Sequence, residues 1–372
     1  MAIQLRKIIK LMESFAPPDL AESWDNPGLL VGNPDDEISH VLVALDVTMD
    51  CVDYAARNKI DLIISHHPVI FNALKSIRTD DYDGRMLQKL LVHHIGVYSA
   101  HTNWDSADGG VNDILAEKIG LTNLQGLVPV QEEKLFKIAV YVPPSHVTLV
   151  RNALGESGAG FIGRYSHCSF SVPGEGQFLP LSGTHPFIGT PGVLEQTQEV
   201  RIETIVPESR LSLVLSAVKL AHPYEEPAID IYPLVNKGRH YHLGRIGTLP
   251  EPETARIFLR KLKRNLGIQI LTYAGDEDKV ISKVAVCGGS GASFIGAAKK
   301  AGAQLYLTGD VKYHEAQEAV KAGLVIADGG HFGTENPSVE VLARRLQSTG
   351  RERGWDVLWE ADNKSRDIFK HC

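Results

Sequence analysis

Two stretches of the chain, one near each end, share the same order of apolar runs and helical patterns. Each reads strand, helix, strand, helix, strand, and its strands are short, nearly all-apolar runs without clean alternation. Such runs are typical of parallel strands that are buried on both faces of a sheet. The pattern therefore predicts a duplicated α/β unit. The predicted strands are 41–46, 61–68, 284–289, 304–310 and the runs that begin at Gly96 and Leu324; the predicted helices are 49–58, 85–92, 293–301 and 313–321.

Polar residues gather at matching places in the two halves. They follow the second and third predicted strands, as His66-His67 and HTNWD (101–105) in one half and as TGD (308–310) and HFGTE (331–335) in the other. Any α/β protein can show a repeated rhythm by chance, but chance does not account for this shared position. Because ligand sites in open parallel sheets lie outside the carboxyl ends of the strands, we expect a site there.

The middle of the chain follows a different order, βαββαβ, over residues 135–234. Its predicted helices are 146–156 and 209–221, and a Gly- and Pro-rich loop spans 174–192. This order is the split-βαβ or ferredoxin-like arrangement. A domain is inserted at little cost when its ends lie close together, so we expect an α+β domain between the two halves. The loop exceeds the usual connection length, which indicates a functional or mobile segment.

Length, charge and cysteines narrow the class of protein. The 372 residues exceed the size of one core, so two or three compact units are expected. A net charge of −7 and the lack of a basic, aromatic-interleaved run argue against nucleic-acid binding. The four cysteines form neither C-x-x-C pairs nor a disulfide framework, which fits a cytoplasmic protein. Apolar positions in residues 3–12 predict an amphipathic helix that ends before Pro17, and no membrane span.

The polar clusters offer metal ligands, and each also has a structural interpretation. His66 and His67 end an apolar strand, and an imidazole pair there is either metal-bound or held by hydrogen bonds. Asp105 offers a carboxylate that can bridge two metals, or it is the N-cap of a helix near Val111. His331 and Glu335 lie four residues apart, and a helix over 334–345 would bring them together; alternatively, Glu335 favours a helix N-terminus.

Taken together, three histidines and two carboxylates favour metal binding. Such sets suit zinc, iron or manganese more than calcium. Five ligands are too many for one catalytic zinc, which takes three, and suit two metals that share carboxylates. The sequence therefore predicts a two-metal centre, whose ligands are His66, His67, Asp105, His331 and Glu335.

Three other clusters carry weaker indications. The turn Gly288–Gly291 lacks a complete nucleotide-binding motif and is either an anion cradle or a plain tight turn. Lys312 and His314 could bind phosphate or act as acid or base, unless Asp310 caps a helix and His314 packs. The polar segment 222–227 is interpreted as a solvated turn.

Four motifs together resemble one known family. SHHP (65–68), HTNWD (101–105), TGDVKYH (308–314) and HFGTE (331–335), with WDNPGLLVG (24–32) and GRIG (244–247), resemble the GTP cyclohydrolase I type 2 homologue family, also called NIF-three-like. The resemblance covers both outer segments. The middle region resembles the PII-like or CutA-like insert of longer bacterial members.

The resemblance implies one NIF-three-like α/β domain, made of residues 1–130 and 237–372, and a PII- or CutA-like insert at 131–236. It implies two divalent ions per subunit, zinc or iron with manganese as a further candidate, on the same five ligands, with His101 beside them. It also implies a toroidal homohexamer and a metal-dependent hydrolase of the GTP cyclohydrolase type that acts on a small molecule. His101, Lys312 and His314 are then the candidate catalytic residues. The alternative is a non-enzymatic regulatory protein that uses the insert as a sensor.

Overall fold

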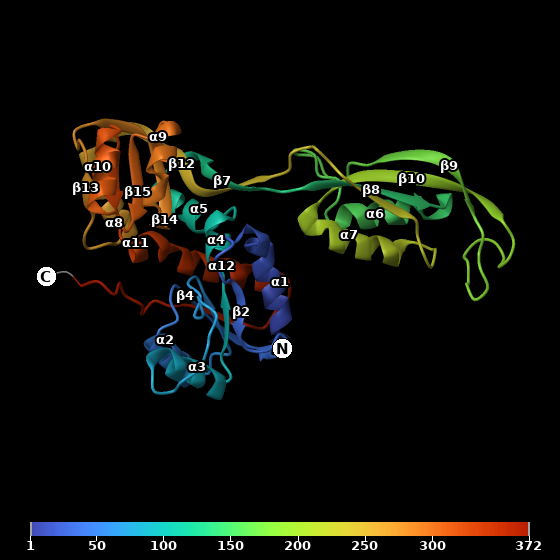
Figure 1. The fold of residues 1–372 in the computed structure, drawn as a ribbon, viewed down its shortest axis with the longest axis horizontal. Coiled ribbons are helices and arrows are strands. Elements are labelled where there is room, and N and C mark those ends of the chain that lie inside the picture. Colours follow the sequence, from blue (N-terminus) through green and yellow to red (C-terminus); the bar gives the residue numbers. More distant parts are fainter. Residues whose placement is uncertain (1, 371–372) are drawn as a thin grey trace. The chain divides into compact units, whose positions relative to one another are not determined.

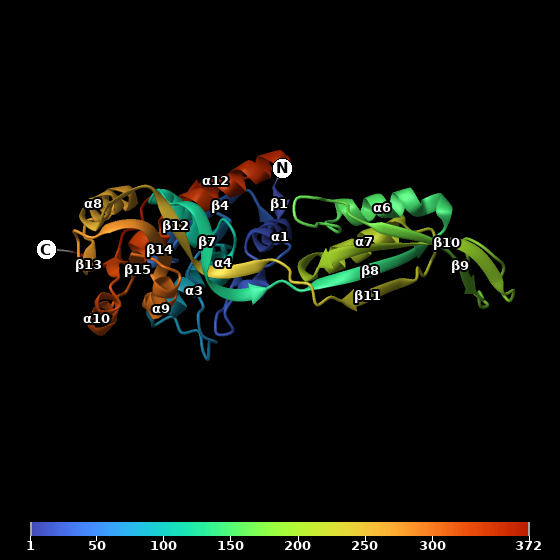
Figure 2. The same cartoon turned by 90° about the horizontal axis from the view of Figure 1, so that it is seen from above.

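The protein was analysed as a computed structural model, which describes residues 2–370. The chain forms two compact units, one made of residues 1–131 with 241–372 and the other of residues 132–240. Figures 1 and 2 show the fold in two views. No helix within the described residues is both long and apolar enough to cross a membrane.

The N-terminal part of the first unit alternates strands and helices much as its apolar pattern predicts. The amphipathic helix α1 ends at Phe15, before Pro17, as predicted. The elements are β1 (Ile3–Gln4), α1 (Leu5–Phe15), η1 (Pro18–Leu20), β2 (Gly28–Val31), β3 (Glu37–Ile38), β4 (His40–Ala44), α2 (Met49–Arg57), β5 (Leu62–Ser65), α3 (Tyr82–Val92), β6 (Gly96–Ser99), α4 (Thr102–Ser106), α5 (Val111–Lys118) and β7 (Thr122–Glu132).

The C-terminal part of the first unit repeats the strand–helix alternation. Its elements are β12 (His240–Thr254), α8 (Ala255–Leu266), β13 (Thr272–Ala274), β14 (Val280–Ser290), η3 (Ala292–Phe294), α9 (Ile295–Lys300), β15 (Leu305–Gly309), α10 (Tyr313–Lys321), β16 (Val325–Asp328), α11 (His331–Glu335), α12 (Pro337–Glu352) and β17 (Leu358–Ala361). The predicted helix over 334–345 is instead two helices, because α11 begins three residues earlier and ends before Pro337.

Each part of the first unit builds a sheet with a parallel centre. One sheet has the order β17-β4-β5-β6-β2, in which only β2 is antiparallel to its neighbour. The other has the order β13-β16-β15-β14-β12-β7, with β14, β15 and β16 parallel. Strands β4, β5, β15 and β16 are buried almost throughout, which explains their all-apolar runs.

The two parts of the first unit exchange elements, so neither is a separate core. Helix α12 packs on β4 and β17 of the first sheet, and Leu342 and Leu346 join the core around Val41 and Val43. Helix α5, from the N-terminal part, packs on β14, and Leu115 joins the core of the second sheet. The short helix α11 contacts β14 and β15. This exchange holds the carboxyl ends of β5, β6 and β16 around one site.

The second unit has a core of its own, which includes Ile138, Val150, Ile202 and Val214. Its sheet has the order β11-β8-β10-β9, and all its pairs are antiparallel. Helices α6 and α7 pack against each other and against β10. The elements are β8 (Leu135–Val142), η2 (Pro144–His146), α6 (Val147–Glu156), β9 (Phe170–Phe178), β10 (Glu195–Pro207), α7 (Glu208–Ala221) and β11 (Ile229–Pro233).

Candidate metal centre

Four histidines meet in the first unit, and each is held through its Nδ1 atom. His66 and His67 follow β5, His101 follows β6, and His331 begins α11. An Nδ1–H that donates to oxygen leaves the lone pair of Nε2 available, as in metal-binding histidines. The acceptors are Ala100 O for His66 (2.9 Å), Asp46 Oδ1 for His67 (2.7 Å), Asp25 Oδ1 for His101 (2.7 Å) and Asp310 Oδ2 for His331 (2.7 Å).

Glu335 lies at the centre of these rings and divides them into two groups. Its Oε1 is 3.7 Å from Nε2 of His66. Its Oε2 is 3.0 Å from Nε2 of His67 and 3.1 Å from Nε2 of His331. The residue is 4% exposed, so these contacts lie away from water. One carboxylate whose two oxygens face different ligand groups is the arrangement expected of a bridging ligand.

Two atoms of the cluster lack the hydrogen-bond partners that a buried polar atom requires. His66 Nε2 and Asp105 Oδ1 are both buried without a partner, and they lie 3.6 Å apart. The Nε2 atoms of His67 and His331 face each other at 3.3 Å. Because burying lone pairs and charge without a partner is costly, the space between these atoms calls for a cation. The residues present therefore fit a metal.

Three sets of side chains each bring their ligand atoms within 4.8 Å of one another. They comprise all five predicted ligands and His101, and Glu335 belongs to two of the sets. The sets are His66 with Asp105 and Glu335; His67 with His331 and Glu335; and His66 with His67 and His101. The structure therefore gathers side chains from both halves of the unit into one cluster that could bind metal.

The protonation of the cluster follows from its burial and its charges. Burial lowers the pKa of His67, but hydrogen bonds to Asp46 and Glu335 outweigh it and raise that pKa to about 10. The hydrogen bond that His331 donates to Glu335 raises the pKa of His331 to about 9. Burial raises the pKa of Asp105 to about 6, although His66 opposes the change. Without metal, protons on the histidines thus balance part of the buried negative charge.

Glu335 stays ionised in this setting. Burial alone would raise the pKa of its carboxyl, but the charge of His66 and hydrogen bonds with His331 and His67 hold that pKa well below its usual value. The pKa of His66 is raised, because the charges of Asp105 and Glu335 outweigh the lowering effect of burial. The carboxylate is therefore ready to bind a cation.

The glycine turn that follows the core of β14 makes room for Glu335. Gly289 has φ of +59°, and a Cβ there would lie 2.1 Å from Oε1 of Glu335. Its N–H donates to Thr334 Oγ1, and the N–H of Gly291 donates to Thr308 Oγ1. Since these donors are already used inside the protein, the turn acts as a support for α11 rather than as an anion cradle.

The structural alternatives for two carboxylates are wrong. Asp105 lies inside α4, and the N-cap of α5 is Gly110. Asp310 does not cap α10, whose N-cap is Lys312, and it instead accepts a hydrogen bond from His331. Both carboxylates are thus directed to the cluster.

Lys312 and His314 lie outside the converging sets. Both are exposed at the start of α10. The ring of His314 contacts Gln317 through Nδ1 at 3.2 Å and packs edge-on near Tyr313. Their catalytic role remains a prediction.

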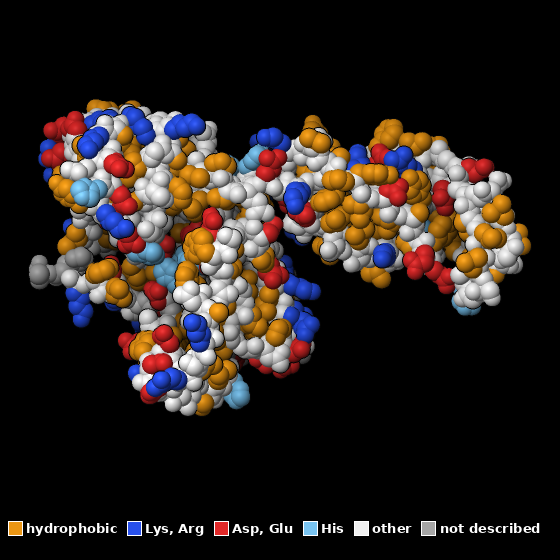
Figure 3. All heavy atoms as spheres, in the orientation of Figure 1, with side chains coloured by type: hydrophobic (Ala, Val, Ile, Leu, Met, Phe, Trp, Pro, Cys, Tyr) orange, Lys and Arg blue, Asp and Glu red, His pale blue; other side chains and the backbone are white. Residues whose placement is uncertain are grey.

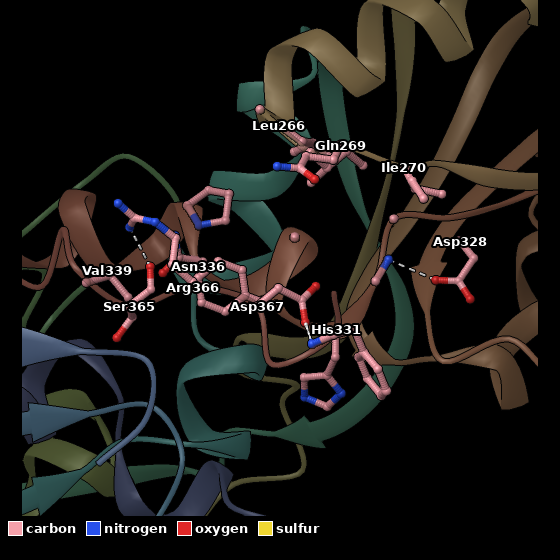
Figure 4. Close-up of a pocket in the computed structure, with 18 of the residues that line it drawn as sticks. Leu266, Gln269, Ile270, Asp328, His331, Asn336, Val339, Ser365, Arg366 and Asp367 are labelled. Carbon is pink, nitrogen blue, oxygen red and sulfur yellow. Dashed lines mark hydrogen bonds between the residues drawn. The ribbon is translucent and has the colours of Figure 1, made fainter. Parts of the chain in front are cut away.

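A cavity adjoins the cluster on the His331 side (Figure 4). Its volume is about 940 Å³, and it is bordered by the segment from Leu266 to Ile270, the end of β16 with the start of α11, and the C-terminal segment 362–370. It offers room for a small molecule beside a candidate ligand. In the space-filling view, histidine side chains reach the surface of this unit, with acidic and hydrophobic side chains close to them (Figure 3).

Three carboxylates that accept hydrogen bonds from the histidine rings were not identified as such from the sequence. Asp25, Asp46 and Asp310 hold His101, His67 and His331. Hydrogen bonds from His101 and Thr102 outweigh burial and lower the pKa of Asp25 to about 2. A signal existed, because Asp46 and Asp310 each follow an apolar strand and Asp25 lies in the WDNPG motif.

Fold and site together define a mixed α/β protein with a buried His/carboxylate cluster that could bind metal. Comparison with known proteins identifies the family. A family model described as Duf34/NIF3 (NGG1p interacting factor 3) matches residues 3–365, and the chain belongs to this family.

Relatives match the chain over nearly its whole length. A Bacillus subtilis (strain 168) protein named "GTP cyclohydrolase 1 type 2 homolog" is 45% identical over 95% of this chain and 94% of its own length. A Mycobacterium tuberculosis protein of the same name is 40% identical over 94% and 92%. The crystal structure of a Bacillus cereus protein related to NIF3 is 43% identical, covers 100% of both chains and has a TM-score of 0.92.

Proposed function

We propose that this protein is a metal-dependent hydrolase with two divalent ions in its centre. His66, Asp105 and Oε1 of Glu335 would hold one ion, and His67, His331 and Oε2 of Glu335 the other. The observation that carries the proposal is the buried pair of unpartnered atoms, His66 Nε2 and Asp105 Oδ1, beside a carboxylate that faces both groups. Zinc or iron suits this ligand set, and manganese is a further candidate.

Two such ions, when bound, would supply a nucleophile at neutral pH and orient a substrate. The residues of this chain have separate tasks. Asp46 and Asp310 fix the rings of His67 and His331. Asp25 holds Nδ1 of His101, so Nε2 of that ring is the atom that accepts or returns a proton beside the ligands.

The name of the relatives, "GTP cyclohydrolase 1 type 2 homolog", gives the first substrate to test. Ring opening of GTP is a hydrolysis, and the cavity beside His331 has the volume to admit a molecule of that size. We therefore propose a small cyclic substrate of this kind, in a cytoplasmic homo-oligomer. Lys312 and His314 are kept as candidate contacts for phosphate.

The test is metal analysis of protein purified without added metal, followed by a formate-release assay with GTP on the same sample. We expect about two metals per chain. Glu335→Gln and Asp105→Asn should lose metal and turnover together. Glu352→Gln, which removes an exposed carboxylate on α12, is the matched control and should change neither. Full metal and full activity in Glu335→Gln would show that the ligand assignment is wrong.

A second candidate function is a non-enzymatic regulator. It is favoured by the second unit, which has its own core and the chain order βαββαβ. We interpret this unit as a ferredoxin-like insert of the PII or CutA kind that senses a ligand, an interpretation that rests on the arrangement of its elements alone. It predicts that a ligand binds the insert and changes assembly or metal access, and that the protein has no turnover.

A further inference from the structure

Two exposed aromatic rings lie next to His101, beside the otherwise polar side chains of the cluster. Trp24 is 57% exposed and Phe71 is 46% exposed. Their ring centroids are 5.9 Å apart, and they lie 6.1 Å and 6.3 Å from the ring of His101. Single exposed apolar residues are common, but adjoining exposed rings at a polar cluster are not explained by packing.

His101 joins this aromatic pair to the metal ligands. Its ring centroid is 5.2 Å from that of His66 and 5.6 Å from that of His67. A molecule that touches Trp24 and Phe71 is thus one imidazole ring away from the ligands. The cavity borders His331 instead, so the two features lie next to different ligands of the cluster.

Hydrogen bonds hold the backbone on both sides of the rings. Asp25, next to Trp24, accepts from His101 Nδ1 at 2.7 Å and from the N–H of Thr102 at 3.0 Å. The side chain of Asn26 donates to the carbonyl of Ile70, next to Phe71, at 2.6 Å. The two aromatic residues come from separate segments, yet both segments are fixed to the site. Such preorganised rings give contact area at low entropic cost.

We propose that Trp24 and Phe71 form an aromatic platform that stacks a planar nitrogen heterocycle, such as a nucleobase, against the metal centre. Every planar base has a π face, so stacking recognises this class of molecule without a particular hydrogen-bond pattern. A substrate ring that stacks on Trp24 and Phe71 lies beside the proposed metal ligands. Its bond to be hydrolysed is therefore held near the metal centre. This inference rests on the proposed function and assigns the residues that hold the ring of its substrate.

The test measures guanosine binding by calorimetry on full-length, metal-loaded protein, with ribose as the probe that lacks a base. Loss of one stacking ring costs about 1–3 kcal/mol, so Trp24→Ala and Phe71→Ala should each raise the Kd for guanosine by about 5-fold to 150-fold. Trp24→Phe, which keeps a ring, should recover most of the affinity. Tyr165→Ala, at an exposed aromatic residue of the second unit, should leave the Kd unchanged.

Metal content is measured in every variant, because it separates failure of the proposed metal centre from failure of the aromatic platform. If the wild type holds no metal, the proposed function fails. If metal is full but the wild type does not bind guanosine, or both alanine variants bind it normally, the platform is overturned while the metal centre stands. Ribose binding as tight as guanosine binding also overturns it.

The exposed rings of Trp24 and Phe71 could instead contact a second copy of the chain. Acrylamide quenching compares wild type with Trp24→Phe in the absence of ligand. We expect a readily quenched component that belongs to Trp24 and that guanosine protects. If Trp24 is already shielded in the assembled protein and guanosine changes nothing, the rings belong to a subunit contact and the proposal is wrong.

Discussion

Glu335 reaches His66, His67 and His331 because one residue of β14 has no side chain. At Gly289 a Cβ would lie 2.1 Å from Oε1 of Glu335, and φ of +59° is unfavourable for any other residue. Gly289 is thus required both for its left-handed backbone conformation and for the space that Glu335 occupies. The two can be separated, because Gly354 has φ of +69° and open space around it.

We predict that Gly289→Ala loses metal whereas Gly354→Ala does not. Both substitutions should destabilise the protein by about 1–2 kcal/mol, because both place alanine in the left-handed region. Only at Gly289 must Glu335 also move. Denaturant unfolding and metal analysis of the two variants check this, and equal metal content would mean that Glu335 can bind from a shifted position.

We predict that metal affinity rises with pH. In the metal-free protein the pKa of His67 is about 10 and that of His331 about 9. Their charged forms contribute stability that is complete below the ordinary histidine pKa of about 6.5 and is lost as pH rises through 9 and 10. A metal must displace these protons, so affinity should rise about tenfold per pH unit for each displaced proton between pH 6.5 and 9.

Zinc competition with a chelator of known pH dependence, at pH 6.5, 7.5 and 8.5, measures this slope. His314→Asn removes an exposed histidine outside the cluster and should leave it unchanged. A flat profile would mean that the histidines are neutral before metal binds.

At the scale of elements, apolar runs predicted strands well because both sheets have buried parallel centres. They did not predict β17, whose residues Leu358–Ala361 pair with β4 from the far end of the chain. They also missed the break between α11 and α12, since the start of α11 depends on Gly330 at φ of +75°. Asp25 lies in the WDNPG motif, but its hydrogen bond to His101 joins positions 76 residues apart, so the motif alone could not show which side chain it holds.

A buried arginine links β12 to the segment around α5. Arg245 is 4% exposed and makes two hydrogen bonds to the carboxylate of Asp113, at 2.6 Å and 2.9 Å. It also donates to the carbonyls of His242 and Ala107. The guanidinium thus donates hydrogen bonds to oxygen atoms from both the N-terminal and the C-terminal part of the unit, next to α5, which packs on β14.

We predict that Arg245→Ala lowers the free energy of unfolding by about 2–4 kcal/mol, because it removes a buried guanidinium that makes two hydrogen bonds to the partly buried carboxylate of Asp113. Arg256→Ala, at an exposed arginine paired with Glu277 and Asp278, is the control and should leave the unfolding midpoint within error. Urea unfolding of both variants distinguishes the two cases. A small loss in Arg245→Ala would indicate that water replaces the guanidinium.

At the scale of the whole molecule, the chain leaves and re-enters the first unit at one place. Strands β12 and β7 are neighbours in its second sheet, and the N–H of Glu133 donates to the carbonyl of Arg239 at 2.8 Å. The ends of the second unit are therefore close, which is the geometry that tolerates insertion.

We predict that replacing residues 133–239 by a short Gly-Ser linker leaves a folded first unit with its full metal content. Metal analysis and thermal unfolding compare it with the whole chain. The hydrolase proposal predicts turnover by the first unit, whereas the regulator proposal predicts that the insert controls assembly or metal access. The formate assay and the oligomeric state are therefore measured on the same samples. Unchanged metal, turnover and assembly would count heavily against the regulator.

The exchange of α5 and α12 between the two sheets has a consequence for biosynthesis. His66, His67 and Asp105 leave the ribosome long before His331 and Glu335, which follow after residues 106–330. At about 5–20 residues per second that interval is roughly 10–45 s. During it the nascent chain lacks the carboxylate of Glu335, strand β17, which completes the first sheet, and α12, which packs on that sheet. If the proposed metal centre is correct, it can therefore be completed only after Glu335 has been synthesised, and we expect metal to bind the nearly finished polypeptide rather than the early nascent chain.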